Sequence, residues 1–358
     1  MISGLPAELI DELCSYLSPG DLAQLSQTNR RLSLHSQRRL YRKVGLASCL
    51  AVARFCHSLL RNGALAPLVK RLKISSREPI HGLLTGYARL IARVAPSLVN
   101  LAVLSAPYAP RAFHGLSTTH FPRLTDCTIP NSNDVPEFLR RNRTLVDLTI
   151  KDLVAWHPMA ETLGLFELYG PFPQKPISLH ALRSYTGPPW TALWFSRKRC
   201  SALILTPASQ ALSRQPAAAQ LIRPLGSRAL SVITYSPRDW TCPTLISALH
   251  ESFPNLRCVT MRVRQPEGWE VFLASFEAAL TSFKKLEAIG LNDRRYTPWN
   301  LPDEDQRIRA VAWAAKCPTL RVLYLADSHY LRHSVPGGYE WRPTEFLALH
   351  LPQCTPIV

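Results

Sequence analysis

The feature that most constrains this chain is a short unit that recurs irregularly through residues 65–325. In its clearest form a proline is followed, two residues on, by a strand-like run of the type Leu-x-x-aliphatic-x-aliphatic. The clear copies begin at Ala95, Phe121, Phe253 and Cys317. Residues 69–74, 145–150 and 283–291 carry the same run without the proline. Alternating apolar residues predict a strand in each copy.

The spacing of the copies leaves room for one helix between successive strands. Counted from the first aliphatic residue, the copies start at 69, 98, 124, 145, 182, 256, 286 and 320. The gaps are 21–37 residues except for one of 74, which has room for two weaker strands at 203–205 and 230–233. Between the strands, apolar residues three or four apart indicate helices.

A strand and a helix in each unit, with the Leu-x-x-Leu-x-Leu pattern, resemble a degenerate leucine-rich repeat. Such units bury their apolar faces against their neighbours and form a curved solenoid. An ordinary α/β domain with parallel strands has the same alternation and stays the alternative. We expect an α/β protein in which an irregular solenoid follows a small helical domain.

The pattern also predicts which side chains point away from the core, because neighbours along a strand face opposite sides. The expected outward residues are Lys70, Arg71, Lys73, Asn100, Asp126, Asp147, Thr149, Lys151, Arg183, Arg257, Thr260, Arg262, Glu287, Arg321 and Tyr324. Basic residues are frequent at both ends of this set. We therefore expect target contacts at Lys70, Arg71, Lys73, Arg183, Arg257, Arg262 and Arg321, and an acidic or phosphorylated target segment.

The first forty residues have a different pattern, that of three short helices. Pro6 suits the start of a helix, and Leu9, Ile10, Leu13 and Leu17 follow at helical spacing as one apolar stripe. The run 18–20, Ser-Pro-Gly, ends this helix, and Asp21 is expected to cap the next one. Helices this short bury little of their apolar surface on one another, so we expect a partner to cover them.

This segment resembles an F-box. The family pattern of Leu-Pro-x-Glu, paired aliphatic residues and a later Asp-Leu is matched from Leu5 to Leu25. F-boxes bind the Skp-type adaptor of SCF ubiquitin ligases, while the rest of the chain captures a substrate. The resemblance implies adaptor-binding or motif-packing roles for one set of residues. They are Leu5, Pro6, Leu9, Ile10, Leu13, Leu17, Leu22 and Leu25.

An F-box followed by degenerate leucine-rich repeats is typical of fungal F-box proteins. We expect an F-box at 1–44, a helical linker at 45–64, the solenoid at 65–326 and a C-terminal cap at 327–358. The resemblance implies a substrate-recognition subunit that reaches a cullin through the Skp-type adaptor. The alternatives are a non-catalytic scaffold outside ubiquitination and a basic solenoid that binds nucleic acid.

Positive charge is concentrated in two parts of the chain. The net charge is +17, and residues 22–125 alone have 16 basic residues against the single acid Glu78. Residues 183–264 have 11 basic residues and two acidic ones. Such blocks attract acidic proteins or nucleic acid, although a solvated basic surface has the same composition.

The sequence lacks the motifs that are typical of several classes of function. No phosphate-binding glycine loop, zinc-protease motif or serine-hydrolase motif occurs, so we expect no enzyme activity, cofactor or metal. No apolar run is long enough for a membrane helix. The first 17 residues have acids and no Lys or Arg, unlike a secretory or mitochondrial leader, which favours the cytoplasm and/or nucleus. The nine scattered cysteines are expected to be buried thiols.

Overall fold

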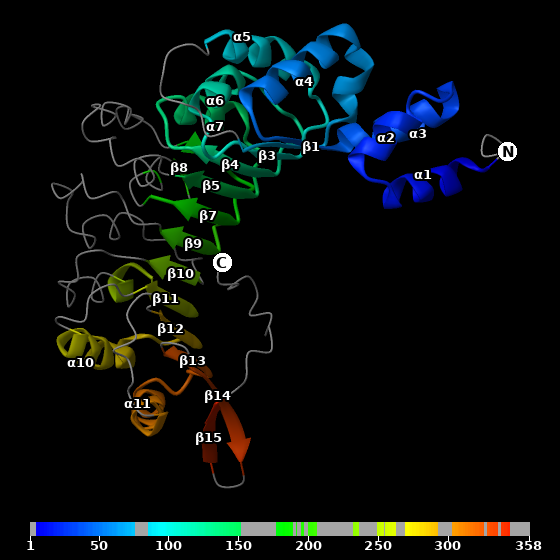
Figure 1. The fold of residues 1–358 in the computed structure, drawn as a ribbon. Helices are drawn as coiled ribbons and strands as arrows, with labels where there is room; N and C mark the ends of the chain where they lie inside the picture. The colour runs from blue at the N-terminus through cyan, green and yellow to red at the C-terminus, as the bar shows by residue number, and fades with distance from the viewer. Residues whose placement is uncertain are drawn as a thin grey trace. The chain divides into compact units, whose positions relative to one another are not determined.

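The structure is a computed structural model with mixed helix and strand content (Figure 1). It divides into two compact units, residues 1–182 and 183–358, which are described separately. The described residues are 5–75, 85–151, 177–188, 191, 195–196, 200–205, 232–235, 249–253, 255–262, 269–292, 303–325, 328–335 and 338–343.

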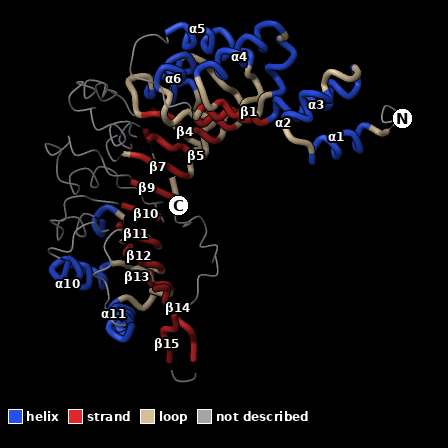
Figure 2. The backbone as a smooth tube through the Cα atoms, in the orientation of Figure 1, coloured by secondary structure: helices blue, strands red, loops and turns tan. Residues whose placement is uncertain are grey.

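The first unit begins with three helices and continues with alternating strands and helices. Its elements are α1 (Ala7–Tyr16), α2 (Pro19–Leu25), α3 (Arg30–Arg42), β1 (Lys43–Leu46), α4 (Cys49–Arg61), η2 (Gly63–Leu68), β2 (Arg71–Ile74), α5 (Thr85–Val94), η3 (Ala95–Ser97), β3 (Val103–Ser105), α6 (Pro110–Ser117), β4 (Asp126–Pro130), α7 (Val135–Arg141), β5 (Asp147–Lys151) and β6 (Ile177–Ser178). Strands β1 to β5 pair in chain order, all parallel. Helices α4, α5 and α6 lie on one side of this sheet (Figure 2).

The second unit continues the same order of parallel pairing and ends in an antiparallel hairpin. Its elements are β7 (Ser184–Gly187), β8 (Phe195–Ser196), β9 (Ala202–Leu205), β10 (Val232–Tyr235), β11 (Cys258–Arg262), α10 (Trp269–Ala279), η9 (Leu280–Ser282), β12 (Ala288–Asn292), α11 (Asp303–Lys316), β13 (Val322–Leu325), β14 (Ser328–Val335) and β15 (Gly338–Pro343). Strands β7 and β9 to β13 are parallel neighbours. Strands β14 and β15 reverse direction, within the segment expected as a cap.

Each strand that the recurring unit predicts is a strand in the structure, usually beginning two residues after the first aliphatic residue. Leu124 precedes β4 in this way, and Leu320 precedes β13. Those first aliphatic residues are buried, with at most 2% of the residue exposed: Val69, Leu98, Leu124, Leu145, Leu182, Leu256, Leu286 and Leu320. The repeated leucine therefore anchors each strand in the core.

The described prolines of the clear copies, Pro96, Pro122 and Pro318, belong to tight turns that lead toward the strands. The amide of Leu124 donates to the carbonyl of Phe121 at 3.2 Å, which closes a turn with Pro122 at its second position. The amide of Leu320 donates to Cys317 in the same way at 3.0 Å. Proline holds the φ angle that this position of a turn requires. The chain thus turns sharply from each helix into the next strand.

Several strands are joined by a backbone carbonyl that lies just ahead of one strand and accepts hydrogen bonds from two consecutive amides at the start of the next strand. The carbonyl of Lys70 accepts hydrogen bonds from the amides of Ala102 and Val103. The carbonyls of Ala102 and Thr125 do the same for the next two strands. In the second unit Arg183, Arg257 and Glu287 have this role. Three residues whose side chains were expected to contact a target, Lys70, Arg183 and Arg257, therefore also join successive strands through their backbone carbonyls.

The segment expected as a linker, residues 45–64, contains a helix and part of a strand of the alternating strands and helices. Residues 45–64 include α4, and β1 starts directly after α3 and pairs with β2. Tyr41 of α3 stacks on Phe55 of α4, with ring centroids 6.5 Å apart. The three-helix region is therefore joined to the sheet without a spacer.

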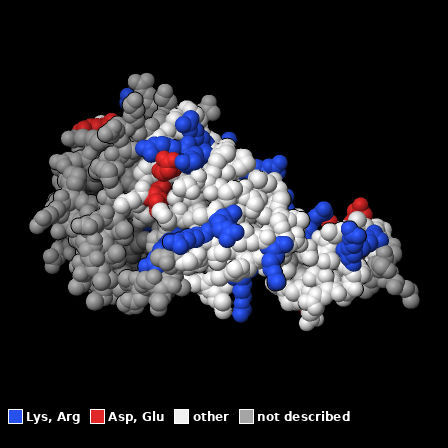
Figure 3. Space-filling view, turned by 90° about the horizontal axis from the view of Figure 1, so that it is seen from above, with Lys and Arg blue, Asp and Glu red and all other residues white. Residues whose placement is uncertain are grey.

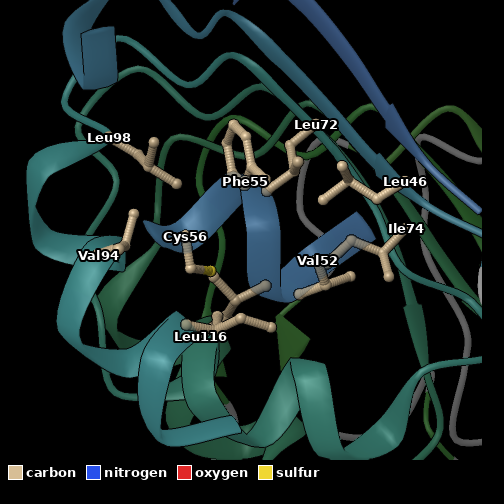
Figure 4. Close-up of a pocket in the computed structure, with 10 residues that line it drawn as sticks. Leu46, Val52, Phe55, Cys56, Leu72, Ile74, Val94, Leu98 and Leu116 are labelled. Carbon is tan, nitrogen blue, oxygen red and sulfur yellow. The ribbon is translucent and has the colours of Figure 1, made fainter. Parts of the chain in front are cut away.

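The core of the first unit lies between the sheet and its helices. Phe55 and Cys56 of α4 face Leu72 of β2 and Leu116 of α6 (Figure 4). Their packing leaves a cavity of about 10 Å³ lined by apolar side chains and the Cys56 thiol. Such a cavity offers a water molecule too few polar partners, so we expect it to stay dry.

A buried asparagine supports the copy at 145, which lacks the proline. The Asn142 side chain accepts from the amide of Phe121 at 2.7 Å and donates to the carbonyls of Thr119 and Phe138 at 3.0 and 2.9 Å. It is fully buried. A buried polar group is stable only when its hydrogen bonds are made, and this one side chain bonds all three groups; the Phe138 carbonyl also accepts from the Asn142 backbone amide at 3.0 Å.

Asn142→Ala is expected to lower the free energy of unfolding by about 2–5 kcal/mol, because it leaves one amide and two carbonyls without this partner. Urea denaturation followed by circular dichroism measures the change. Asn133→Ala, at an exposed position of the loop after β4, is the control. Equal midpoints for the two variants would contradict the role of Asn142.

The described cysteines are free thiols, and all are buried except the half-buried Cys49. Burial raises the pKa of the Cys56 thiol to about 11 from about 9. Iodoacetamide at pH 8 is therefore expected to modify Cys49 well before Cys56 in the folded protein, as peptide mass spectrometry can measure. Equal rates at Cys49 and Cys56 would contradict the burial of Cys56.

The raised pKa of Cys56 also makes the stability of the fold depend on pH. The thiol of the unfolded chain loses its proton near pH 9, and the buried thiol loses it only near pH 11. The stabilisation linked to this burial is therefore present below pH 9 and is lost toward pH 11.

Candidate functional site

Helix α1 has one buried face and one exposed face. Ile10 and Cys14, each about 1% exposed, form a small core with Leu22 of α2 and Leu32 of α3. On the outer face, Leu9 is 46% exposed, Leu13 51% and Tyr16 80%, and the adjoining Leu17 is 37% exposed. We call these four residues, Leu9, Leu13, Tyr16 and Leu17, the outer face of α1. Its members are large apolar or aromatic side chains whose surface is in contact with solvent.

The position of α1 is held by polar contacts just before its first turn and near its middle. The Arg31 guanidinium of α3 donates to the carbonyl of Leu5 at 2.6 Å. His35 of α3 lies 2.6 Å from the Asp11 carboxylate. These contacts fix α1 against α3 and leave the apolar outer face free of any role in the small core.

The cap of α2 differs from the expectation at one residue. Ser18, not Asp21, is the N-cap, and its hydroxyl accepts from the Asp21 amide at 3.2 Å. The Asp21 carboxylate accepts in return from the Ser18 amide at 3.3 Å, which completes a capping box. The expectation was wrong because Pro19 and Gly20, read as helix breakers, begin the helix; proline is favoured at a first helical turn.

The eight residues expected to bind the adaptor or to pack the motif fall into a buried or partly buried group and an exposed group. Ile10 and Leu22 are buried inside the three helices, and Leu5 and Leu25 pack against that core. Pro6, Leu9, Leu13 and Leu17 are exposed. The packing alternative thus describes the first group, and contact of the second group with an adaptor stays a prediction. The expected set omitted Tyr16, although its spacing of three from Leu13 and seven from Leu9 places it on the same helix face.

The second candidate surface is the sheet face opposite the helices, where basic residues were expected. Arg71 and Lys73 of β2 are exposed and alternate with the buried Leu72 and Ile74. Lys70 precedes them and is also exposed. Lys43 of β1 lies beside Arg71 in the parallel register. The first two strands therefore present a compact group of cations.

The other expected target residues lie in the second unit and have different surroundings. Arg257 binds Glu287 through two hydrogen bonds of 3.0 and 2.7 Å, so its charge is compensated on the neighbouring strand. Arg183 and Arg321 are exposed just before β7 and β13. Arg262 ends β11 opposite Asn292 in register, and its side chain is outside the described residues. The structure does not bring these arginines together with Lys70, Arg71 and Lys73 in one unit.

Positive charge is not confined to the strands. Lys and Arg side chains are spread over the surface seen in Figure 3, and Asp and Glu appear in few places. Over the described ranges, no group of three or more His, Cys, Asp or Glu side chains is placed to hold a metal ion. No helix in the described part of the chain is long and apolar enough to cross a membrane.

Comparison with known proteins identifies the N-terminal region. The F-box-like family model matches residues 2–47, which cover α1, α2, α3 and β1. The chain therefore has an F-box-like domain there, and the resemblance found in the sequence is confirmed for this region. Its fungal type stays a prediction.

Other comparisons add little. No curated protein matches the chain. The crystal structure of a Bacteroides fragilis protein is similar with 12% sequence identity and a TM-score of 0.46, covering 86% of this chain and 79% of that chain. A likeness at this level carries no conclusion for the protein.

The two faces of α1 predict opposite responses to mutation. Ile10→Ala is expected to destabilise the three-helix core by about 2–5 kcal/mol, because it opens a cavity. Leu13→Ala is expected to change stability by less than about 0.5 kcal/mol, as at other exposed positions. Hydrogen exchange of peptides from residues 5–42, followed by mass spectrometry, measures both. Faster exchange in the Leu13→Ala protein than in the Ile10→Ala protein would contradict the assignment of the faces.

Proposed function

We propose that this protein is a substrate-recognition subunit of an SCF-type ubiquitin ligase. It binds a Skp-type adaptor through the F-box-like domain and reaches a cullin through that adaptor. The observation that carries the proposal is the outer face of α1, an exposed apolar surface on a domain whose family typically binds such adaptors. The protein itself has no catalytic step in this role, and it acts in the cytoplasm and/or nucleus.

The energetics of the outer face support a binding role. Burial of apolar surface contributes about 25 cal/mol per Å², or about 1.5–3 kcal/mol for a whole leucine side chain. Leu9 and Leu13, each about half exposed, retain a good part of this free energy in the isolated chain. An aromatic side chain such as Tyr16 is a frequent anchor in protein interfaces. Most of the free energy available from burying the outer face of α1 is therefore released only when a partner covers it.

We propose further that residues 65–326 form a degenerate leucine-rich-repeat solenoid that captures a protein target, with 327–358 as its cap. Support comes from parallel strands in chain order, from the buried aliphatic residue that precedes the strands of the recurring unit and from the carbonyl that bridges several pairs of successive strands. The F-box at 1–44 and the segment at 45–64 precede it, and β1 and α4 extend the same alternation into that segment. The target is a protein with an acidic or phosphorylated segment.

The adaptor contact is tested by binding of the full-length protein to a purified Skp-type adaptor. Leu13→Asp combined with Leu17→Asp is expected to weaken binding at least about 100-fold, because two charges would have to be desolvated in an apolar interface. Leu60→Asp on α4 is the matched control, since Leu60 is 41% exposed and lies outside the F-box-like domain. The control is expected to bind like the wild type.

Two results would overturn the proposed contact: binding by the double variant at wild-type affinity, or no binding by a folded wild-type protein. A second assay adds the cullin and separates a ligase subunit from a scaffold. A ligase subunit forms the ternary complex of protein, adaptor and cullin. Adaptor binding that excludes the cullin would contradict the ligase role and favour the scaffold.

A further inference from the structure

Strand β1 forms the edge of the sheet in the first unit. It pairs with β2 on one side, and no other described strand pairs with it. Just ahead of β1, the carbonyl of Arg42 accepts from the Lys70 amide at 3.1 Å. At the end of β1, the carbonyl of Leu46 accepts from the Ser75 amide at 2.8 Å. These two bonds show which backbone groups of β1 are directed toward β2.

The backbone groups of Lys43 and Gly45 point the other way. Alternate residues of a parallel strand direct their amides and carbonyls to the same neighbour, so Arg42, Val44 and Leu46 face β2. The amides and carbonyls of Lys43 and Gly45 are therefore directed to the edge that no described strand occupies, and both residues are exposed. Such an edge is a template for pairing with another extended polypeptide. A sugar–phosphate backbone has no amide donors and does not match it.

The face of β1 and β2 away from the helices is basic. Leu46 and Leu72 line the cavity between the sheet and the helices, so the residues next to them in each strand face the other side. Three exposed cations lie on that side: Lys43, Arg71 and Lys73. Over the described ranges, none of the three has an ion-pair partner. An acidic side chain added beside Lys43 would reduce its repulsion with Arg71, which is its neighbour in register.

Gly45 keeps the surface above the edge open. It lies beside Lys73 in register, and a Cβ at this position would meet no heavy atom within 4 Å beyond its chain neighbours. A strand added to the edge would lie one strand spacing, about 4.8 Å, from β1. An acidic side chain opposite Gly45 can then extend across the glycine toward Lys73, because no side chain stands between them.

We infer that the edge of β1 binds an extended segment of the target as an added strand, with two acidic side chains separated by one residue. One acid stands opposite Lys43 and the other opposite Gly45, where it extends toward Lys73. The residue between them points to the helix side, beside the half-buried Val44, where an aliphatic side chain fits. The spacing is the same for a parallel and an antiparallel added strand. The inference deepens the proposed function, on which it rests for the acidic target segment.

Charge disfavours a second copy of this chain as the occupant. Two β1 strands paired with each other would bring Lys43 and Arg71 of both copies together, in a protein with a net charge of +17. Like charges on adjacent strands oppose pairing, and a lysine on an edge strand is a common protection against self-association. The same side chains attract an acidic strand. Lys43 therefore selects the partner and does not close the edge.

The probe is a fluorescently labelled twelve-residue peptide whose centre reads Thr-Val-Glu-Val-Glu-Val-Thr. A control peptide with the centre Thr-Val-Glu-Glu-Val-Val-Thr has the same composition but places its two acids on opposite faces of a strand. Fluorescence anisotropy with the full-length protein measures both affinities. The alternating peptide is expected to bind about fivefold more tightly, the upper range for one exposed ion pair.

Proline at position 45 tests the backbone contact. Gly45→Pro removes an amide that points away from β2, and proline is found in edge strands at such positions, so pairing of β1 with β2 is expected to survive. This variant is expected to bind the alternating peptide about tenfold more weakly, because a hydrogen bond is lost. Gly45→Ala keeps the amide and is the matched control, with an expected change below about twofold. Thermal melting followed by circular dichroism checks that both variants fold.

Lys43→Gln tests the charge contact and leaves the backbone groups unchanged, so it decides the case if the proline variant does not fold. It is expected to weaken the alternating peptide about fivefold, with a smaller effect at high salt. Arg123→Gln is the matched control, because Arg123 is exposed in the turn before β4, which β2 and β3 separate from β1. The control is expected to leave the affinity unchanged.

The inference is contradicted by absence of peptide binding, by equal binding of the two peptides, or by wild-type affinity in a folded Gly45→Pro protein. Equal effects of Lys43→Gln and Arg123→Gln also contradict it. So does tighter binding of a single-stranded DNA 12-mer than of the alternating peptide, or dimerisation of the protein that displaces the peptide in sedimentation experiments.

The Skp-type adaptor is tested on the same variants and in competition with the peptide. Displacement of the peptide by the adaptor would assign the edge to the adaptor and refute it as a target site. Intact adaptor binding together with a failed peptide test would refute the added strand alone and leave the proposed function standing. Peptide binding without adaptor binding would have the opposite meaning.

Discussion

The hydrogen bond on which most of the structure depends joins the backbone just ahead of one strand to the start of the next. A single carbonyl, such as that of Lys70, Ala102 or Thr125, accepts two amides from the following strand. This contact fixes the parallel register, and the register in turn decides which side chains share a row. A buried leucine two residues before most of the strands that the recurring unit predicts, such as Leu124 and Leu320, supports it from the core. The faces on which partners could bind are consequences of this backbone pattern.

The same pattern extends back to the F-box-like domain. Helix α3 ends at Arg42 and β1 begins at Lys43, and the Arg42 carbonyl accepts from the Lys70 amide at 3.1 Å. The stacking of Tyr41 on Phe55 adds a side-chain contact across the same junction. Within the first unit, the outer face of α1 and the basic residues of β1 and β2 are therefore parts of one packed structure. In a ligase, such a junction would hold a target at a defined place relative to the adaptor.

The two surfaces differ in the physics that would drive binding. The outer face of α1 is apolar, so its contribution to affinity comes from area removed from water, and salt should affect it little. The basic residues Lys70, Arg71 and Lys73 are exposed ions, whose contribution is modest, falls with ionic strength and favours specificity over affinity. An apolar surface such as the outer face of α1 suits a stable contact with an adaptor that is always the same. A charged surface suits a selective contact with a target.

Local patterns in the sequence located the strands of the recurring unit and the F-box-like domain. The leucine of each unit and the proline turn at Phe121 or Cys317 act over a few residues, so spacing alone located the strands, and the Leu-Pro start indicated the F-box. Strand β1 and the hairpin of β14 and β15 lack that unit and were not found. Only the tertiary structure divided the aliphatic residues of α1 into Ile10 inside and Leu13 outside, paired Arg257 with Glu287 and aligned Arg71 with Asp126. Those outcomes depend on packing and register between segments far apart in the chain, which no local spacing records.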